Sequence, residues 1–324
     1  MFAAAPLDHA RCSGCSLCRL VCPMWRQHRD PRFSPEGLAR ARQCGASAAE
    51  LTAPLEACSL CGACDPVCPE GIDLSGMVME LRQHLSPALP YRQALDALQA
   101  RFALAAAAAE VPAAGALFLP GPALRAHPVL LARVRALLGY ACAADDGADI
   151  ALALETGGEI SPARRRRFLD RLDGRTLAVG DGLLLRQLRH WLPGARLQSL
   201  GAALASLMPI RRRIASTDFY VIEPRAYHAD YERLVAYYDR LQAETGCALN
   251  LDLQRIAIPA QTPALTPALP HLTGPLADAD VAQARWMLQG RAPRRILVES
   301  LADRAAFERV CDIPVLHLAE LAQD

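Results

Sequence analysis

The feature that most constrains this chain is a cysteine pattern that occurs twice between residues 12 and 69. Each copy has the form C-x2-C-x2-C-x3-C-P, and the eight cysteines are Cys12, Cys15, Cys18, Cys22, Cys58, Cys61, Cys64 and Cys68. A backbone loop with this spacing holds a cubane iron–sulfur cluster. The first three cysteines of a run can point into one small pocket, whereas the fourth, ahead of a proline, reaches outward to a neighbouring cluster.

The spacing therefore predicts two [4Fe–4S] clusters whose ligands cross between the runs. We expect one cluster to be held by Cys12, Cys15, Cys18 and Cys68, and the other by Cys58, Cys61, Cys64 and Cys22. A pair of zinc sites is an alternative, but such sites usually combine two C-x2-C knuckles into one closed tetrahedron. Disulfides are another alternative, and they require an oxidising compartment.

The composition is that of an ordinary globular protein, with 52% hydrophobic and 21% charged residues. The N-terminus lacks the basic segment and the sustained apolar segment of a signal peptide, and thiolate ligands need reduced sulfur. We therefore expect a cytoplasmic protein, with at most peripheral contact with the inner face of a membrane. The net charge of +1 gives no reason to expect a nucleic acid partner.

The residue patterns divide the chain into four parts and predict an α+β fold. Residues 1–85 are predicted to form an all-helical domain, because Ser34-Pro35-Glu36 is a helix start and apolar residues recur at helical spacing over 74–85. Residues 86–111 are predicted to be a helical linker. Residues 112–215 and 216–324 are predicted to be two copies of an α/β unit, each with a small parallel sheet.

The duplication is inferred from elements that match in order between the two copies. The predicted strand pairs are 116–120 and 219–224, 150–154 and 256–259, 175–180 and 295–299, and 195–200 and 314–318. Helices are predicted at 128–138 and 162–172 in the first copy, and at 231–245 and 278–288 in the second. The proline-rich segment 259–275 is predicted to be a loop.

In this order of parts the chain resembles a known family. Two such cysteine runs, 35 residues apart in a helical domain before a duplicated α/β half, are similar to the iron–sulfur subunits of glycolate oxidase and anaerobic glycerol-3-phosphate dehydrogenase. Lactate-utilisation iron–sulfur proteins and heterodisulfide reductase subunits are similar too. The likeness is specific over residues 10–85 and topological beyond them. It implies a flavin-dependent partner dehydrogenase that oxidises a 2-hydroxy acid or a similar small metabolite, and a quinone or another electron carrier downstream.

The same resemblance implies a third cluster, because the family carries further cysteines after the strands of its duplicated half. The corresponding positions here hold Thr156-Gly157-Gly158, Val179-Gly180-Asp181-Gly182, Arg225, Pro259-Ala260-Gln261 and Val298-Glu299-Ser300. The remaining cysteines, Cys142, Cys247 and Cys311, have no neighbour at ligand spacing. We therefore expect this chain to lack the third cluster.

The function predicted from these features is that of an electron-transfer subunit with no catalytic residue of its own. It would carry single electrons through two [4Fe–4S] clusters between a flavoprotein dehydrogenase and a quinone or another carrier. Two alternatives stay open: a catalytic subunit of the heterodisulfide or thiol reductase type, and an assembly scaffold with structural clusters.

A few other residues carry weaker expectations. His228 follows a predicted strand, where α/β folds place ligands, and is a minor candidate for a binding role. The arginine runs 164–167 and 211–213 are predicted to be solvated helix faces rather than docking patches. Cys44 is predicted to be a small buried residue.

Overall fold

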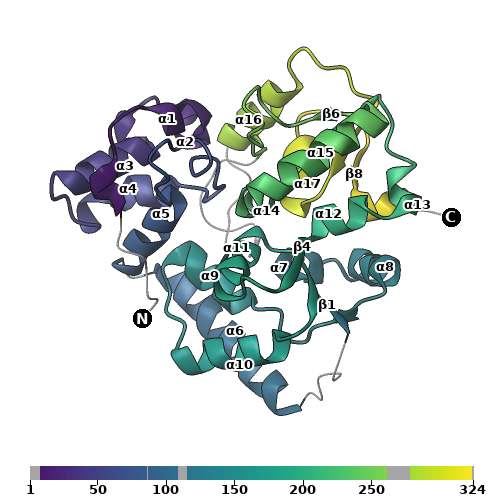
Figure 1. Cartoon of the computed structure of the whole chain (residues 1–324), viewed down its shortest axis with the longest axis horizontal. Helices are drawn as coiled ribbons and strands as arrows, with labels where there is room; N and C mark the ends of the chain where they lie inside the picture. Colours follow the sequence, from purple (N-terminus) through teal and green to yellow (C-terminus); the bar gives the residue numbers. More distant parts are fainter. Residues whose placement is uncertain (1–7, 86, 109–114, 261–277, 323–324) are drawn as a thin grey trace.

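The computed structural model of the chain describes residues 8–85, 87–108, 115–260 and 278–322. It has the predicted α+β fold, with a helical N-terminal part and two units that each contain a parallel four-stranded sheet. In Figure 1 the helical part lies at the upper left, the first sheet unit below it and the second at the upper right. Most of the predicted loop 259–275 lies outside the described residues.

The N-terminal part consists of short helices around two loops. Its elements are η1 (Asp8–Arg11), α1 (Leu17–Val21), α2 (Pro23–His28), η2 (Pro31–Phe33), α3 (Pro35–Gln43), η3 (Ala49–Leu51), α4 (Thr52–Ala57) and α5 (Leu74–Gln83). The predicted helix start is confirmed: the Ser34 hydroxyl accepts a hydrogen bond from the Gly37 N–H at 3.0 Å, and Pro35 is the first helical residue.

A long helix, α6 (Leu89–Ala108), connects this part to the first sheet unit and packs against α9. The strands of the unit are β1 (Ala116–Leu119), β2 (Ala141–Cys142), β3 (Thr176–Val179) and β4 (Arg196–Ser199), in the order β2-β1-β3-β4. Its helices are α7 (Gly121–Arg125), α8 (Pro128–Leu138), α9 (Ala148–Thr156), α10 (Pro162–Leu172), α11 (Gly182–Trp191), α12 (Leu200–Ala205) and α13 (Met208–Arg211).

The second unit repeats the topology of the first. Its strands are β5 (Asp218–Val221), β6 (Ala248–Leu249), β7 (Arg295–Val298) and β8 (Val315–His317), in the order β6-β5-β7-β8, and every pair in both sheets is parallel. The helices are α14 (Pro224–Ala229), α15 (Tyr231–Thr245), α16 (Asp278–Leu288), α17 (Leu301–Glu308) and η4 (Leu318–Ala322). The same strand order in both sheets supports the predicted duplication.

Two of the predicted strands are wrong. Residues 150–154 belong to helix α9, whose nine residues are all buried, and a helix buried on every side shows the same unbroken apolar run as a buried strand. Residues 256–259 form no strand, only an antiparallel bridge between Leu251 and Ala257. The strands in these places are β2 and β6, which at two residues each are too short to leave an alternating pattern.

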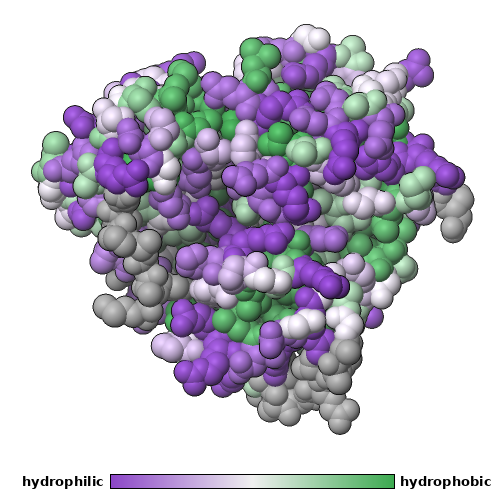
Figure 2. All heavy atoms as spheres, in the orientation of Figure 1, coloured by the Kyte–Doolittle hydropathy of each residue, from purple (hydrophilic) through white to green (hydrophobic). Residues whose placement is uncertain are grey.

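The hydrophobic core runs across all three parts. One cluster of buried side chains joins the N-terminal helices to the first unit, and a second joins the two sheet units. A small cluster of Val21, Cys61, Ala63 and Ile256 connects the N-terminal loops directly to the second unit. The face in Figure 2 is largely hydrophilic, with separate hydrophobic areas. None of the helices in the described ranges has the length and hydrophobicity needed to cross a bilayer.

Candidate functional site

The two cysteine loops have the same backbone conformation. In each run the third and fifth residues have positive φ angles: 76° and 67° at Gly14 and Ser16, and 52° and 76° at Leu60 and Gly62. Non-glycine residues adopt this left-handed region only at a cost of about 1 kcal/mol or more. A conformation repeated at matching positions, twice with a non-glycine residue, indicates that both loops are shaped for the same purpose.

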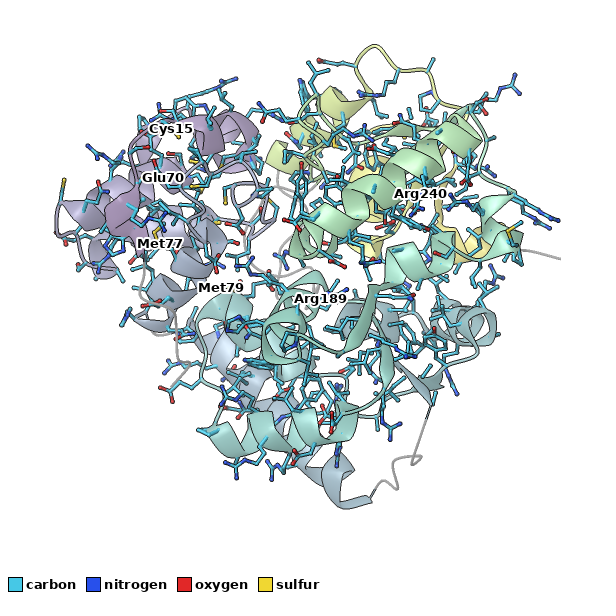
Figure 3. All side chains as sticks on the ribbon, in the orientation of Figure 1. Cys15, Glu70, Met77, Met79, Arg189 and Arg240 are labelled. Atoms are coloured by element: carbon cyan, nitrogen blue, oxygen red, sulfur yellow. The ribbon has the colours of Figure 1, made fainter. Side chains whose placement is uncertain are left out.

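The structure brings Cys12, Cys15 and Cys18 of the first run together with Cys68 of the second. These four line one cavity, together with Glu36, Glu70 and the two serines Ser13 and Ser16. Cys15 is solvent-exposed, whereas Cys18 is buried. Figure 3 shows Cys15 and Glu70 in the N-terminal helical part, far from the sheet units that Arg189 and Arg240 mark.

The other four cysteines form a second group. The Cys22 thiol interacts electrostatically with Cys58 and Cys61, and the Cys64 thiol interacts with all three. Burial is the main reason why the pKa of Cys61 rises to about 11, with neighbouring Cys58 adding to the rise. Burial also raises the pKa values of Cys22 and Cys64, because a thiolate without a counter-charge is costly in the interior.

Both groups fit the ligand set of a [4Fe–4S] cluster. All twelve cysteines of the chain are free thiols, and each group supplies four of them from two loops. In the described part of the chain, no three His, Cys, Asp or Glu side chains converge as ligands of a single metal ion do. Bound iron would offset the penalty that burial places on the thiolates. A cluster, when bound, supplies one-electron redox chemistry.

His228 fastens the second loop to the second sheet unit. Its Nε2 accepts the Ala257 N–H at 3.2 Å, so the ring proton lies on Nδ1, which donates to the Cys61 carbonyl at 2.7 Å. A β-carbon on Gly62 would lie 3.0 Å from the His228 Cβ, which explains the glycine there. His228 therefore supports the cluster loop, and the structure gives it this role in place of the ligand-binding role considered from the sequence.

Three arginines also hold the second loop, and sequence reasoning missed this function. Arg225 donates to the Ser59 carbonyl at 2.7 Å and pairs with buried Glu155 at 2.6 Å. Arg82, itself buried, donates to the carbonyls of Leu55, Cys58 and Glu155. Arg186 of α11 pairs with Asp65, the residue after Cys64, at 3.1 Å. Side chains from both sheet units thus fix the backbone around Cys58, Cys61 and Cys64.

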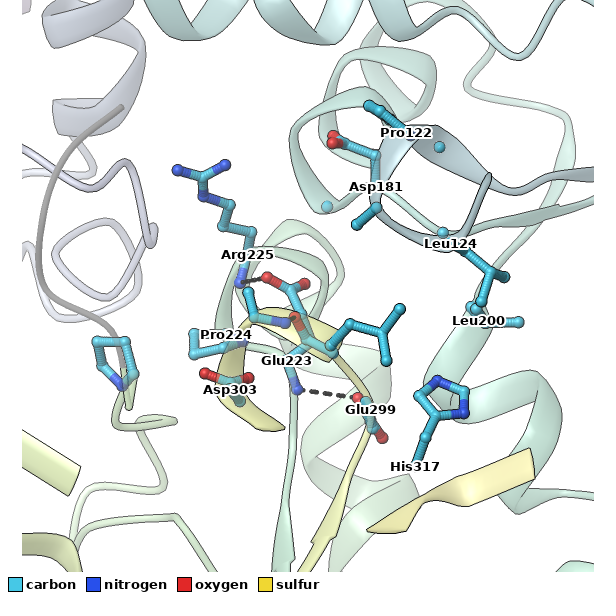
Figure 4. A pocket seen from close by; sticks show the side chains of 18 of the residues that line it. Pro122, Leu124, Asp181, Leu200, Glu223, Pro224, Arg225, Glu299, Asp303 and His317 are labelled. Atoms are coloured by element: carbon cyan, nitrogen blue, oxygen red, sulfur yellow. Dashed lines mark hydrogen bonds between the residues drawn. The ribbon is translucent and has the colours of Figure 1, made fainter. Parts of the chain in front are cut away.

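A cavity of about 100 Å³ adjoins this loop, where the carboxyl ends of strands from both sheets face each other. Figure 4 shows Asp181 on one side, Glu223 and Arg225 on another, and Leu200 and His317 opposite. The positions expected to replace family cysteines mostly line it: Gly180-Asp181-Gly182, Arg225, Pro259 and Glu299-Ser300. Gly157 lies elsewhere, against the backbone of Arg82.

Four carboxyl groups line the cavity: Glu299 and Asp303 are buried, and Asp181 and Glu223 are half-buried. Burial raises the pKa of Glu223 to about 7, and it also raises the pKa values of Asp181, Glu299 and Asp303. Glu223 accepts the N–H groups of Arg225 and Ala226 at the start of α14, and Asp181 caps α11 by accepting the Leu184 N–H. Glu223 and Asp181 therefore also cap the N-terminal ends of helices, which accounts for their place at the strand ends.

His317, on the floor of the cavity, should make the protein sensitive to acid. Burial lowers its pKa to about 4, so the native state resists a proton that the unfolded chain binds below about pH 6.5. The contribution of neutral His317 to the free energy of unfolding is therefore fully present above that pH and is lost as the pH falls toward 4. We expect His317→Gln, whose amide oxygen can still accept the Ala319 N–H, to remove about 2 kcal/mol of the loss between pH 7.5 and 5.

Urea unfolding of the anaerobic holoprotein at both pH values would measure this difference. His127→Gln, a change at an exposed histidine, is the control and should lose as much stability on acidification as the wild type. Equal losses in the wild type and in His317→Gln would contradict the assignment.

Two minor expectations from the sequence are wrong. Arg164 does not belong to a solvated face: it is buried and pairs with Asp145 and Asp149 at 2.7 Å each. Cys44 is exposed, not buried, because it caps the C-terminal end of α3. A run of arginines in the sequence does not show which of them pairs with a distant carboxylate, and the small size of Cys44 does not show whether it is buried.

Comparison with known proteins bears on the N-terminal part. Residues 8–72 match the family model described as a 4Fe-4S dicluster domain. Neither the comparison with curated proteins nor that with solved structures gave a match. The helical N-terminal region is thus a ferredoxin-like iron–sulfur domain, and the match supports [4Fe–4S] clusters and an iron–sulfur electron-transfer role.

Proposed function

We propose that this chain is the electron-transfer subunit of an oxidoreductase complex, with two [4Fe–4S] clusters as its only redox groups. Cys12, Cys15, Cys18 and Cys68 would hold the first cluster, and Cys58, Cys61, Cys64 and Cys22 the second. The observation that carries the proposal is the crossed grouping of the eight cysteines: each group takes its fourth member from the other run. Each cysteine run thereby touches both clusters, which keeps the clusters close enough for single electrons to pass between them.

The redox partners in this proposal are a flavoprotein dehydrogenase on one side and a quinone or another carrier on the other. A reduced flavin can release its two electrons one at a time, and clusters accept single electrons. The family likeness to the iron–sulfur subunits of glycolate oxidase and related dehydrogenases is part of the proposal, as is a cytoplasmic location with at most peripheral membrane contact.

In this proposal both sheet units hold the loop of the second cluster in place. Arg225 and His228 come from the second unit, and Arg186 and Glu155 come from the first. Buried hydrogen bonds to a cluster loop fix the cluster's position and tune its potential.

Anaerobic purification of the full chain from its source cells, followed by iron analysis and electron paramagnetic resonance (EPR), tests the proposal. We expect about eight iron atoms per chain and a reduced spectrum with two interacting cubane signals. A flavoprotein should copurify, and its substrate should reduce the clusters. Iron near four per chain, or clusters that no flavoprotein in the complex can reduce, would refute the proposal. About twelve iron atoms would instead favour the reductase alternative.

A further inference from the structure

Arg82 is a buried cation that binds only backbone oxygens. It lies in the last turn of α5 and is 3% exposed. Its guanidinium donates to the carbonyls of Leu55 at 3.0 Å, Glu155 at 2.6 Å and Cys58 at 2.5 Å, and none of its acceptors among the described residues is a carboxylate. A charge taken out of water is costly unless an opposite charge lies near it. An anion is therefore expected close to Arg82 in the functional protein.

The buried carboxylate beside Arg82 already has another partner. The Glu155 side chain pairs with Arg225 at 2.6 Å, and Glu155 offers Arg82 only its backbone carbonyl. The three residues together place two guanidinium cations and one carboxylate in the interior. The ion pair between Glu155 and Arg225 thus leaves the charge of Arg82 without a bonded partner of opposite sign.

The other carboxylates around the second loop also have partners. Asp65 pairs with Arg186 at 3.1 Å. Asp181 and Glu223 act electrostatically on Arg225 from the cavity, and each accepts backbone N–H groups at the start of a helix. These three carboxylates are present whether or not residue 82 is charged, so they do not alter the sign of the effect expected when that charge is removed.

The anion that acts most strongly on Arg82 is a predicted cluster ligand. Burial lowers the pKa of Arg82, and among the charges that oppose this effect the Cys58 thiolate comes first, ahead of Glu155 and the exposed Glu56. The Cys58 carbonyl also accepts a hydrogen bond from the guanidinium. A [4Fe–4S] cluster carries the negative charge of its thiolates, and its net charge helps to set its potential. The second cluster therefore fits as the counter-charge of Arg82.

A purely structural role is the alternative. Arg82 lies at the C-terminal ends of α4 and α9, whose last turns supply the carbonyls of Leu55 and Glu155, and cations stabilise such helix ends. The packing is tight there, since a β-carbon on Gly157 would lie 2.1 Å from the Arg82 carbonyl oxygen. A neutral amide can also donate to a carbonyl, so the hydrogen bonds alone do not require a full positive charge.

We propose that Arg82 is the buried counter-charge of the second [4Fe–4S] cluster and raises its reduction potential. The proposal rests on the proposed function and adds a residue that sets the potential of one of its two redox centres. When the second cluster takes up one electron from its donor, the guanidinium stabilises the added negative charge; no bond forms and no proton is transferred. Because Arg82 is held out of water, its effect on the cluster is screened little by salt.

The test compares Arg82→Gln, which loses the charge but keeps an amide donor, with Arg82→Lys, which keeps the charge. Anaerobic potentiometric titration followed by EPR measures the potential of each cluster in the full-length holoprotein. Cys15→Ala and Cys61→Ala backgrounds, which isolate the second and the first cluster, assign the signals. We expect Arg82→Gln to lower the equilibrium constant for reducing the second cluster on the order of tenfold, which is about 59 mV for one electron. The shift should persist at high salt. Arg82→Lys should keep most of the wild-type potential, and the first cluster should not change.

Arg164→Gln is the control for the loss of a buried arginine. Arg164 is buried too, but it pairs with Asp145 and Asp149, and its helix α10 lies away from the cysteine loops (Figure 1). This variant should be less stable and should keep both potentials. Glu155→Gln is a second arm that does not depend on whether Arg82→Gln retains its second cluster. It removes the buried carboxylate and should raise the potential of the second cluster.

Each other outcome has a defined meaning. An unchanged potential of the second cluster in Arg82→Gln, or an equal fall in Arg164→Gln, overturns the proposal. A fall that Arg82→Lys shares in full assigns the effect to the geometry of the hydrogen bonds and overturns it as well, as does a potential that Glu155→Gln leaves unchanged or lowers. A wild-type protein with only about four iron atoms per chain, or with clusters that no copurified flavoprotein can reduce, would refute the proposed function instead.

Discussion

Replacing Cys68 with alanine is expected to remove the first cluster and leave the second in place. Cys68 lines the cavity of Cys12, Cys15 and Cys18 although it belongs to the other run. A cubane that has lost one of four thiolates is exposed to solvent and oxidant, so the iron content should fall from about eight to about four atoms per chain. In the EPR spectrum of the reduced protein, the broadening that arises from two interacting clusters should disappear.

Double variants separate crossed from uncrossed ligation. If Cys68 and Cys15 hold the same cluster, Cys15→Ala, Cys68→Ala should retain about four iron atoms, the same as either single variant. Cys61→Ala, Cys68→Ala should then lose nearly all iron, because the two residues would belong to different clusters. Uncrossed ligation predicts the opposite pattern for the two double variants.

Cys44→Ala is the matched control for these substitutions. Cys44 lies between the two runs and is exposed at the end of α3, so its removal should leave the iron content and the EPR spectrum unchanged. If Cys44→Ala lost iron as Cys68→Ala does, the loss would reflect general damage to the domain and not a missing ligand.

The sequence predicted those parts of the protein that depend on local pattern. The cysteine spacing predicted which loops face each other, and periodicity predicted helices such as α8, α10 and α15 with their observed bounds. Strand β1 and its counterpart β5 were visible as short apolar runs that end in proline-containing turns. The matching order of these elements was enough to predict two sheets of the same topology.

The hydrogen bonds and ion pairs that fix the second cysteine loop could not be predicted, because they join residues that are far apart in the sequence. Arg82 and Arg225 are ordinary arginines in the sequence, and only the fold brings both to Glu155. Arg164 looked like one of four solvated arginines until its partners Asp145 and Asp149 were placed. A signal did exist for Arg225: it follows Glu223-Pro224 at the end of strand β5, and side chains at the carboxyl ends of parallel strands lie at the edge of the sheet where α/β folds place ligands.

Arg225→Ala is expected to have the second-largest effect. Its guanidinium is the partner of Glu155, whose side chain is only 2% exposed, and it also donates to the Ser59 carbonyl within the second loop. Removing one partner of a buried pair typically costs about 3–5 kcal/mol, and we expect the lower end of this range because Arg82 also acts electrostatically on Glu155. The loss should appear in urea unfolding of the anaerobic holoprotein, and the second cluster should become more sensitive to air than the first.

Arg32→Ala is the matched control, since Arg32 is also an arginine in an ion pair but lies on the surface with its partner Asp30. Exposed pairs contribute little to stability, so this variant should unfold as the wild type does. The double variant Arg225→Ala, Glu155→Gln removes the unpaired charge and should recover part of the lost stability. It should not restore the air stability of the second cluster, because the bond to the Ser59 carbonyl stays absent. If Arg225→Ala unfolded like Arg32→Ala and held both clusters equally well in air, the conclusion that Arg225 stabilises the second cysteine loop would be wrong.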